Sequence, residues 1–219
     1  MDERWAEIDA YLERAMLEPD PALADALAAS DAGGLPSIAV SAVQGAFLQV
    51  LAFGVGARRI LEIGTLGGYS TIWLARAIPN DGRLVTLETS PRHAEVARAN
   101  LDRAGVLDRV EIRVGPALET LPKLRGEPPF DLTFIDADKA STADYFTWAV
   151  DLSRPGAVIV VDNVVRRGDV LDASSDDDAV TGMRRFFERL SSERRVRASA
   201  MQTVGAKGHD GFAIAVVTR

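Results

Sequence analysis

Hydrophobic and polar positions follow two different patterns along this chain, and the change comes near residue 58. In residues 2–17 apolar side chains recur at helical spacing on one side of the segment, which predicts an amphipathic helix. A second, alanine-rich helix is predicted between proline and glycine breaks, and a third from Ser41 to about Phe53. The first 55 residues are therefore predicted to be helical.

Beyond residue 58, short continuous apolar runs replace the helical stripes. Such runs indicate strands that are buried on both faces, as in a parallel sheet covered by helices. Helical patterns alternate with the runs, which favours βαβ units with right-handed crossovers. The predicted strands are 60–63, 84–87, 130–135, 157–161 and, later, about 195–201 and 212–218, and the predicted helices are 69–78, 91–103, 117–124, 141–152 and 179–191.

These elements predict an α/β protein with a Rossmann-like domain. We place this domain at residues 56–219 and a helical N-terminal extension at residues 1–55, with both parts in one compact unit. The last two strands are expected to form a hairpin around Gly205–Gly208, and residues 166–178 are expected to form a charged loop.

Composition and charge exclude several classes of function. The chain has 219 residues and a formal net charge of −7, which argues against nucleic acid as a partner. It has no cysteine and only two histidines, which excludes thiolate chemistry and disfavours a histidine-rich metal site. A charged N-terminus without a basic, then apolar, leader and the lack of a long apolar run predict a cytoplasmic protein that does not bind membranes.

The first predicted strand of the Rossmann-like domain leads into a glycine-rich turn, residues 64–68, and then into a helix. The glycine spacing departs from the G-x-G-x-x-G pattern of dinucleotide-binding proteins, and Glu62 would repel a pyrophosphate. The second strand ends in Glu88, which could accept hydrogen bonds from both hydroxyls of a ribose. A cationic nucleoside with an amino-acid tail, such as S-adenosylmethionine, fits this arrangement better than a dinucleotide.

Acids also follow two later strands. Asp136 ends one of them, and Asp162 and Asn163 end the next. Because neighbouring parallel strands lie roughly 5 Å apart, these side chains could converge at one edge of the sheet. Hard oxygen ligands with open positions suit Mg²⁺ or a similar divalent cation. Lys139, in the loop after Asp136, is a candidate general base for a phenolic hydroxyl.

Purely structural interpretations stay open at these positions. The glycines could have no role beyond shaping a tight turn. The negative charges of the two acids could be balanced by helix N-termini or arginines. Lys139 could be solvated or form a plain salt bridge. His93 is predicted to be a solvated residue in the first turn of its helix.

Three segments together resemble one known family. Residues 60–71, 134–139 and 160–163 are similar to the motifs of the cation-dependent, S-adenosylmethionine-dependent O-methyltransferases, the group of the caffeoyl-CoA and catechol O-methyltransferases and their bacterial relatives. The resemblance runs from about Ser41 to a terminal Asp-Gly-Phe segment at 210–212. It implies a class I methyltransferase fold, with a seven-stranded, mostly parallel sheet whose last strand is antiparallel.

The resemblance also implies roles for single residues. Asp136, Asp162 and Asn163 would bind Mg²⁺, and Lys139 would act with Asp136 in catalysis. The implied residues of the S-adenosylmethionine site, which would also hold the product S-adenosylhomocysteine, are Glu62, Gly64, Thr65, Gly68, Ser70, Glu88, Gly115, Pro116, Ala117 and Asp136. The implied acceptor is a small aromatic molecule with vicinal hydroxyls, and the implied assembly is a homodimer.

The sequence departs from the family pattern near the acceptor side. Thr142 replaces a tyrosine, and Arg166 stands where plant members commonly have an aromatic residue. Two alternatives therefore stay open: methylation of a different acceptor, and a non-catalytic module that binds S-adenosylmethionine. A nucleic-acid methyltransferase is disfavoured because the Pro-Pro-aromatic run at 128–130 precedes a strand instead of following its acid. A hydrolase is disfavoured because the turn lacks the last glycine of G-x-S-x-G.

Overall fold

The computed structural model describes residues 3–219. The chain begins with three helices, α1 (Glu3–Met16), α2 (Pro21–Ala32) and α3 (Ala42–Gly54), as the apolar stripes predict. The predicted start of the first helix at residue 2 lies outside the described residues. Asp20 and Ser41 cap α2 and α3 by accepting hydrogen bonds from backbone N–H groups of the first turns.

Strands and helices then alternate. The strands are β1 (Arg59–Ile63), β2 (Arg83–Glu88), β3 (Val110–Val114), β4 (Phe130–Ile135), β5 (Ser153–Asp162), β6 (Val196–Gly205) and β7 (Gly208–Val217). The α-helices between them are α4 (Tyr69–Ala77), α5 (Pro91–Arg103), α6 (Ala117–Thr120), α7 (Thr142–Leu152) and α8 (Asp178–Ser192). Three short 3₁₀ helices are η1 (Leu107–Arg109), η2 (Leu121–Leu124) and η3 (Arg166–Leu171).

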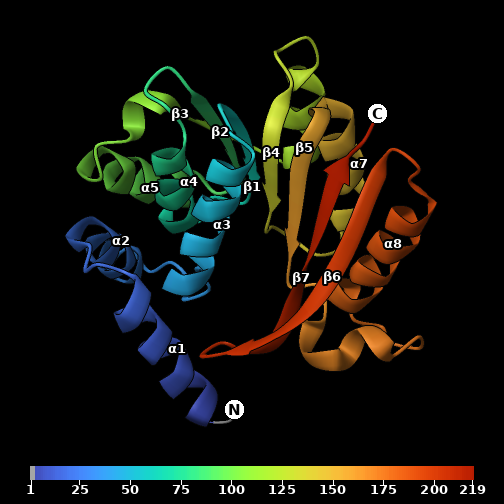
Figure 1. Cartoon of the computed structure of the whole chain (residues 1–219), viewed down its shortest axis with the longest axis horizontal. Helices are drawn as coiled ribbons and strands as arrows, with labels where there is room; N and C mark the ends of the chain where they lie inside the picture. Colours follow the sequence, from blue (N-terminus) through green and yellow to red (C-terminus); the bar gives the residue numbers. More distant parts are fainter. Residues whose placement is uncertain (1–2) are drawn as a thin grey trace.

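All seven strands form one sheet, in the order β3-β2-β1-β4-β5-β7-β6 (Figure 1). The first five strands pair in parallel, and β7 inserts antiparallel between β5 and β6. The predicted fold class, a mostly parallel seven-stranded sheet with an antiparallel last strand, is therefore confirmed. Because β1, β2, β4 and β5 run in one direction, their carboxyl ends lie at the same edge of the sheet, where ligands bind in open α/β folds.

Side chains of each strand alternate between two cores, one on each face of the sheet. Leu61 and Ile63 pack with α6, α7 and α8, whereas Ile60, directly before Leu61, packs with α3, α4 and α5. Leu48 of α3 belongs to the same core as Ile60, so this N-terminal helix covers the sheet together with α4. Burial on both faces explains why the strands read as continuous apolar runs.

Three local features differ from the predicted elements. Strand β3 has no apolar run, because Glu111 and Arg113 alternate with apolar residues in this strand, which forms one edge of the sheet. The single helix predicted at 117–124 divides into α6 and η2, with Pro122 in the first turn of η2. The predicted loop at 166–178 begins with η3.

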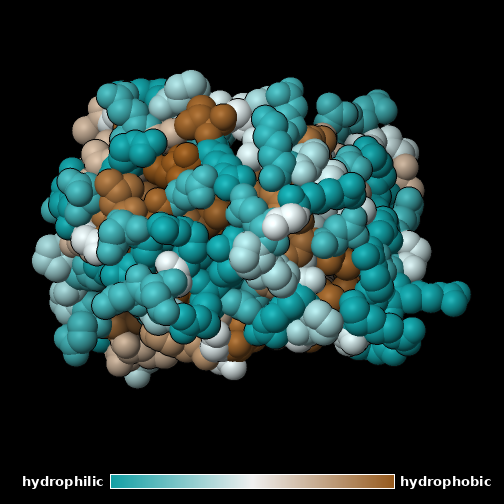
Figure 2. Space-filling view, turned by 90° about the horizontal axis from the view of Figure 1, so that it is seen from above, coloured by the Kyte–Doolittle hydropathy of each residue, from teal (hydrophilic) through white to brown (hydrophobic). Residues whose placement is uncertain are grey.

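Strand register places the C-terminus away from the carboxyl end of β5. Asp162 pairs with Phe212 near the start of β7, whereas Val158 pairs with Val216 near its end. Figure 2 views the molecule from above Figure 1, the side on which the C-terminus lies, and this surface is mostly hydrophilic with smaller hydrophobic areas. Among the described residues, no helix combines the length and apolar character that a bilayer span requires.

Candidate active site

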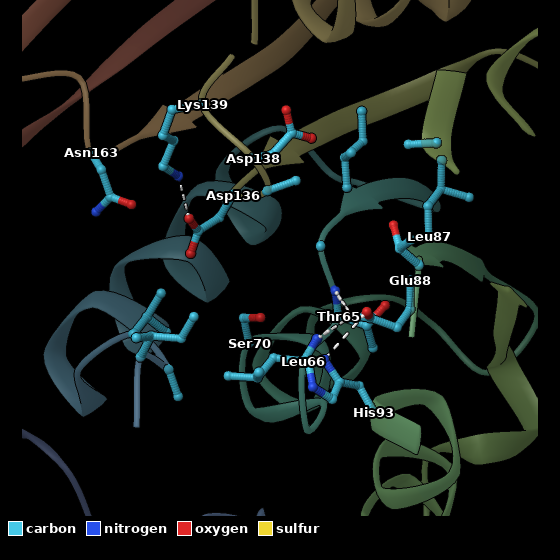
Figure 3. A pocket seen from close by; sticks show the side chains of 18 of the residues that line it. Thr65, Leu66, Ser70, Leu87, Glu88, His93, Asp136, Asp138, Lys139 and Asn163 are labelled. Atoms are coloured by element: carbon cyan, nitrogen blue, oxygen red, sulfur yellow. Dashed lines mark hydrogen bonds and ion pairs between the residues drawn. The ribbon is translucent and has the colours of Figure 1, made fainter. Parts of the chain in front are cut away.

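A cavity of about 500 Å³ lies at the carboxyl ends of the parallel strands. Its walls come from the glycine-rich turn, from the ends of β2, β4 and β5, and from the segment at 36–40 that joins α2 to α3. The predicted site residues that line it are Gly64, Thr65, Ser70, Glu88, Ala117, Asp136, Lys139 and Asn163. Figure 3 shows most of these side chains around one space.

Two glycines let the turn after β1 pass close to other backbone. Gly64 has φ of 101°, and a Cβ added there would lie 2.0 Å from the carbonyl oxygen of Asp136. Gly68 has φ of 83° and is the N-cap residue of α4. Only glycine adopts such conformations without strain, so the sequence of this turn matches its geometry. Gly68 itself does not line the cavity; it holds the turn that places Thr65 and Ser70 there.

The Glu88 carboxylate organises one side of the cavity (Figure 3). Its Oε2 accepts hydrogen bonds from the backbone N–H groups of Thr65, at 3.3 Å, and Leu66, at 2.8 Å, and its Oε1 accepts one from Ser90 at 2.9 Å. His93 Nδ1 lies 3.4 Å from Glu88 Oε1. The carboxylate therefore ties the glycine-rich turn to the end of β2, and it also faces the cavity, where a ribose is expected.

His93 corrects one prediction. The sequence predicts a solvated side chain, but His93 lines the cavity and its side chain is 27% exposed. Its helix begins at the N-cap Ser90, directly beyond the end of β2, so the first turn faces the cavity. A helix-start pattern shows that a residue lies in a first turn, but not which way that turn faces.

Glu62 lies elsewhere than expected. We expected it to line the methyl-donor site, but it is fully buried and absent from the cavity wall. Its carboxylate accepts hydrogen bonds from the hydroxyls of Ser70 (2.7 Å), Thr71 (2.5 Å) and Thr86 (2.7 Å). Burial raises the pKa of Glu62 to about 7, although these hydroxyls oppose the shift. Glu62 thus supports Ser70, which does line the cavity.

Two more predicted donor-site residues also lie outside the cavity wall. Gly115 and Pro116 form the turn after β3, with φ of 136° at Gly115, and only the following Ala117 reaches the cavity. Pro116 is the N-cap residue of α6. The turn therefore positions Ala117 without lining the cavity itself.

Asp136 and Asp162 lie at adjacent strand ends, as the strand pattern predicts, but only Asp136 and Asn163 line the cavity, and Asp162 does not. Ile135 pairs with Val161 in parallel register, so the two acids follow at the same level of the sheet. Burial, and then the negative charge of Asp136, raise the pKa of Asp162 above its ordinary value. Two carboxylates that repel one another at a buried edge form a site suited to a cation.

Lys139 faces the same space. Its Nζ contacts Asp136 Oδ1 (Figure 3), at a distance of 2.7 Å. The Lys139 side chain is 11% exposed. The two residues form a salt bridge, which is the purely structural interpretation that the sequence left open for Lys139. This salt bridge lies in the cavity wall, which Asn163 also lines. Asn163 adopts φ of 60°, an uncommon backbone conformation for a residue other than glycine.

Gln44 is a site residue that the sequence did not reveal. Its Nε2 donates a hydrogen bond of 2.7 Å to Asp162 Oδ2, and the backbone N–H of Asn163 donates one of 2.8 Å to Asp162 Oδ1. Both oxygens of Asp162 are thereby oriented. Gln44 belongs to α3, in the predicted N-terminal extension, and nothing in its local pattern links it to β5.

The donor set fits a hard divalent cation. In residues 3–219 no three His, Cys, Asp or Glu side chains form a metal-binding group. The candidate set is instead two carboxylates and one amide, all oxygen donors, from adjacent strand ends. Such a set leaves positions for water or substrate oxygens, as Mg²⁺ sites commonly do. Asp136, Asp162 and Asn163 would hold the ion.

Behind Lys139, a second carboxylate is satisfied by the protein itself. The Tyr145 hydroxyl donates a hydrogen bond to Asp138 Oδ2, and the backbone N–H of Ser141 donates one of 3.0 Å to Asp138 Oδ1. The Thr142 side chain is buried and contacts the carbonyl of Asp138 at 3.4 Å. These contacts fix the loop that carries Lys139 at the start of α7.

Comparison with known proteins identifies the family. The sequence profile described as O-methyltransferase matches residues 17–215. The chain is 60% identical over 211 residues to a catechol O-methyltransferase from Mycobacterium tuberculosis, covering 96% of this chain and 95% of that protein. It is 50% identical over 212 residues to a catechol O-methyltransferase from Niastella koreensis, covering 96% of each.

Solved structures of similar proteins support the same family. The O-methyltransferase from Bacillus cereus in complex with S-adenosylhomocysteine superposes with a TM-score of 0.97 at 53% identity, over 100% of both chains. The O-methyltransferase TomG from Streptomyces achromogenes, in complex with S-adenosylmethionine, gives a TM-score of 0.96 at 52% identity, again over 100% of both chains. The chain therefore belongs to the O-methyltransferase family, as its three sequence motifs predicted.

Proposed function

We propose that this protein transfers a methyl group from S-adenosylmethionine to one hydroxyl of a small molecule with a vicinal dihydroxyphenyl group, assisted by a divalent cation. The observation that carries the proposal is the cavity in which Asp136, Asn163 and Lys139 face the glycine-rich turn and Glu88. One side offers oxygen ligands and an amine, and the other offers a nucleoside site. Relatives named catechol O-methyltransferase support the acceptor class.

The chain's own residues would bind the donor between the turn and Glu88. Complexes of two structural neighbours with S-adenosylhomocysteine and S-adenosylmethionine support this ligand. Thr65 and Ser70 line the cavity after β1, and Glu88 lines it at the end of β2. The Glu88 carboxylate still faces the cavity while three backbone N–H groups hold it, so it can accept hydrogen bonds from ribose hydroxyls.

The other side of the cavity would activate the acceptor. A divalent cation, when bound, supplies Lewis-acid polarisation of the two phenolic oxygens. Lys139 would take the proton of the hydroxyl that is methylated, and Asp136 orients its amine at 2.7 Å. Gln44 and the Asn163 backbone hold Asp162 in place. Aligning the hydroxyl oxygen with the methyl group then supplies much of the remaining rate enhancement.

The test is a product assay with catechol and labelled S-adenosylmethionine, with and without EDTA. We expect methylated catechol with Mg²⁺, loss of activity with EDTA, and recovery when excess Mg²⁺ is added. Asp136→Asn should abolish turnover while calorimetry still detects S-adenosylmethionine binding. Full turnover in the presence of chelator would contradict metal assistance, and donor binding without turnover of any vicinal diol would favour a different acceptor or a non-catalytic module.

We further propose a homodimer. Apolar side chains lie exposed on α1, α3 and β6, and α1 contacts both of the other elements. They include Tyr11, which is 63% exposed, Phe53 at 59% and Met201 at 61%. Large exposed apolar groups commonly mark protein interfaces. Light scattering at micromolar concentration should give twice the chain mass, and a monomer at that concentration would contradict the proposal.

A further inference from the structure

Arg166 is a charged residue of the cavity wall to which the proposed reaction gives no role. It follows the candidate metal ligand Asn163 by three positions and lines the same cavity as Lys139. Its backbone N–H is hydrogen bonded, but among residues 3–219 its guanidinium has no hydrogen-bond or ion-pair partner. An arginine that lines a cavity and has no protein partner for its guanidinium is available for an anionic group of a ligand.

The chain holds Arg166 there in a strained conformation. Its φ is 54°, a left-handed value that residues other than glycine and asparagine rarely adopt. The Asp210 carboxylate of β7 stabilises this turn, because Oδ1 accepts hydrogen bonds of 3.0 Å from the backbone N–H groups of Val165, Arg166 and Gly211. Strain that several contacts maintain at a cavity wall indicates a side chain whose placement matters.

Nearby carboxylates already have other partners. Asp136 pairs with Lys139, and Asp138 accepts hydrogen bonds from Tyr145 and Ser141. Asp162 is buried and accepts from Gln44. These three carboxylates therefore do not neutralise the positive charge of Arg166.

The position of Arg166 assigns it to the acceptor and not to the donor. The residues expected to hold the donor, Glu88 and the glycine-rich turn, lie across the cavity from Asn163 and Lys139 (Figure 3). Arg166 comes from the loop after β5, on the Asn163 side. An anion that meets it would belong to the molecule whose hydroxyls face Asn163.

We propose that Arg166 selects acceptors that carry a carboxylate on the dihydroxyphenyl ring or its short side chain. This assignment rests on the proposed catechol activity and further specifies that the preferred acceptor is negatively charged. The guanidinium would form a charge-assisted hydrogen bond with the carboxylate while the vicinal hydroxyls face Lys139 and the metal ligands. Arg166 is thus a specificity residue and takes no part in the transfer itself.

The experiment compares two acceptors that differ only in charge, 3,4-dihydroxybenzoate and its methyl ester. With Mg²⁺ and S-adenosylmethionine, the wild-type protein should have the higher kcat/KM for the acid. Arg166→Gln should lower the ratio of acid to ester by roughly tenfold or more, the scale of one charge-assisted hydrogen bond, with little change for the ester. Arg166→Lys, which keeps the charge but loses the planar fork, should give an intermediate ratio.

Arg167→Gln is the matched control. Arg167 carries the same charge and also has a positive φ, of 60°, but it is exposed and lies outside the cavity wall. Its ratio should equal that of the wild type. An unchanged ratio in Arg166→Gln, or an equal fall in Arg167→Gln, would overturn the assignment. Methylation of the ester in every variant would show that the proposed function stands even then, whereas methylation of neither compound by the wild type would overturn both.

Discussion

Gln44 in helix α3 donates a 2.7 Å hydrogen bond to Asp162 at the end of β5, although 118 positions separate the two residues in the chain. The contact joins the helical N-terminal segment to the candidate metal site. Because the carboxylate is 6% exposed, water cannot easily replace the amide as a donor. Helix α3 therefore shapes the site in addition to covering the sheet.

We predict that Gln44→Leu weakens metal activation more than it weakens folding. Removal of the donor leaves Asp162 Oδ2 without its oriented partner, and loss of such a supporting contact typically costs about 10- to 100-fold in metal affinity. The Mg²⁺ concentration for half-maximal methylation should rise by roughly that factor. Gln49→Leu, a matched change on the same helix away from the acid, should leave it unchanged, and an equal rise in both variants would contradict the role of Gln44.

Lys139 yields a prediction about the chemical step. Lys139→Ala should lower kcat by roughly 10²- to 10⁴-fold, the usual contribution of a positioned general base. The affinity for S-adenosylmethionine should stay within about threefold, because Lys139 lies on the Asn163 side of the cavity (Figure 3). Lys123→Ala, at an exposed lysine, should keep full activity. A small change in kcat for Lys139→Ala would leave Lys139 as only the salt-bridge partner of Asp136.

Much of this fold could be predicted because burial on both faces leaves continuous apolar runs. Strands β1, β2, β4 and β5 all showed this signal, and their ends located Glu88, Asp136 and Asp162. Strand β3 gave no such signal, since its alternating pattern reflects its position at the edge of the sheet. Periodicity therefore recovers the centre of a sheet better than its edge.

Site residues that depend on distant contacts could not be predicted. Gln44 acts through a partner on another element, and the orientation of His93 depends on how α5 starts above β2. Glu62 shows the opposite error, since we predicted that it lines the donor site and it does not. It is buried and instead accepts a hydrogen bond from Ser70, which lines the cavity. Local sequence gives residue type and strand end, but tertiary packing decides which side chains face the ligand.

Gly64 offers a test of the turn after β1. Gly64→Ala should destabilise the protein by several kcal/mol and abolish donor binding, because the added Cβ would lie 2.0 Å from the Asp136 carbonyl oxygen. Gly105→Ala is the control, since Gly105 also has a positive φ, of 66°, but no atom within 4 Å of an added Cβ. That variant should lose only about 1–2 kcal/mol, the cost of the left-handed conformation, and keep donor binding. Urea unfolding and calorimetry would measure both effects, and equal losses would contradict the close approach.

Buried Glu62 predicts how stability depends on pH. Its folded pKa, about 7, lies above the ordinary value of 4.5, so the folded state binds more protons than the unfolded state between these values. Stability from this group is therefore present at low pH and is lost as pH rises toward 7. The free energy of unfolding of Glu62→Gln, relative to the wild type, should increase by about 2 kcal/mol between pH 5.5 and 8.5, because the amide stays neutral. Urea unfolding at both pH values measures this difference. A pH-independent difference for Glu62→Gln would show that Glu62 is ionised throughout this range.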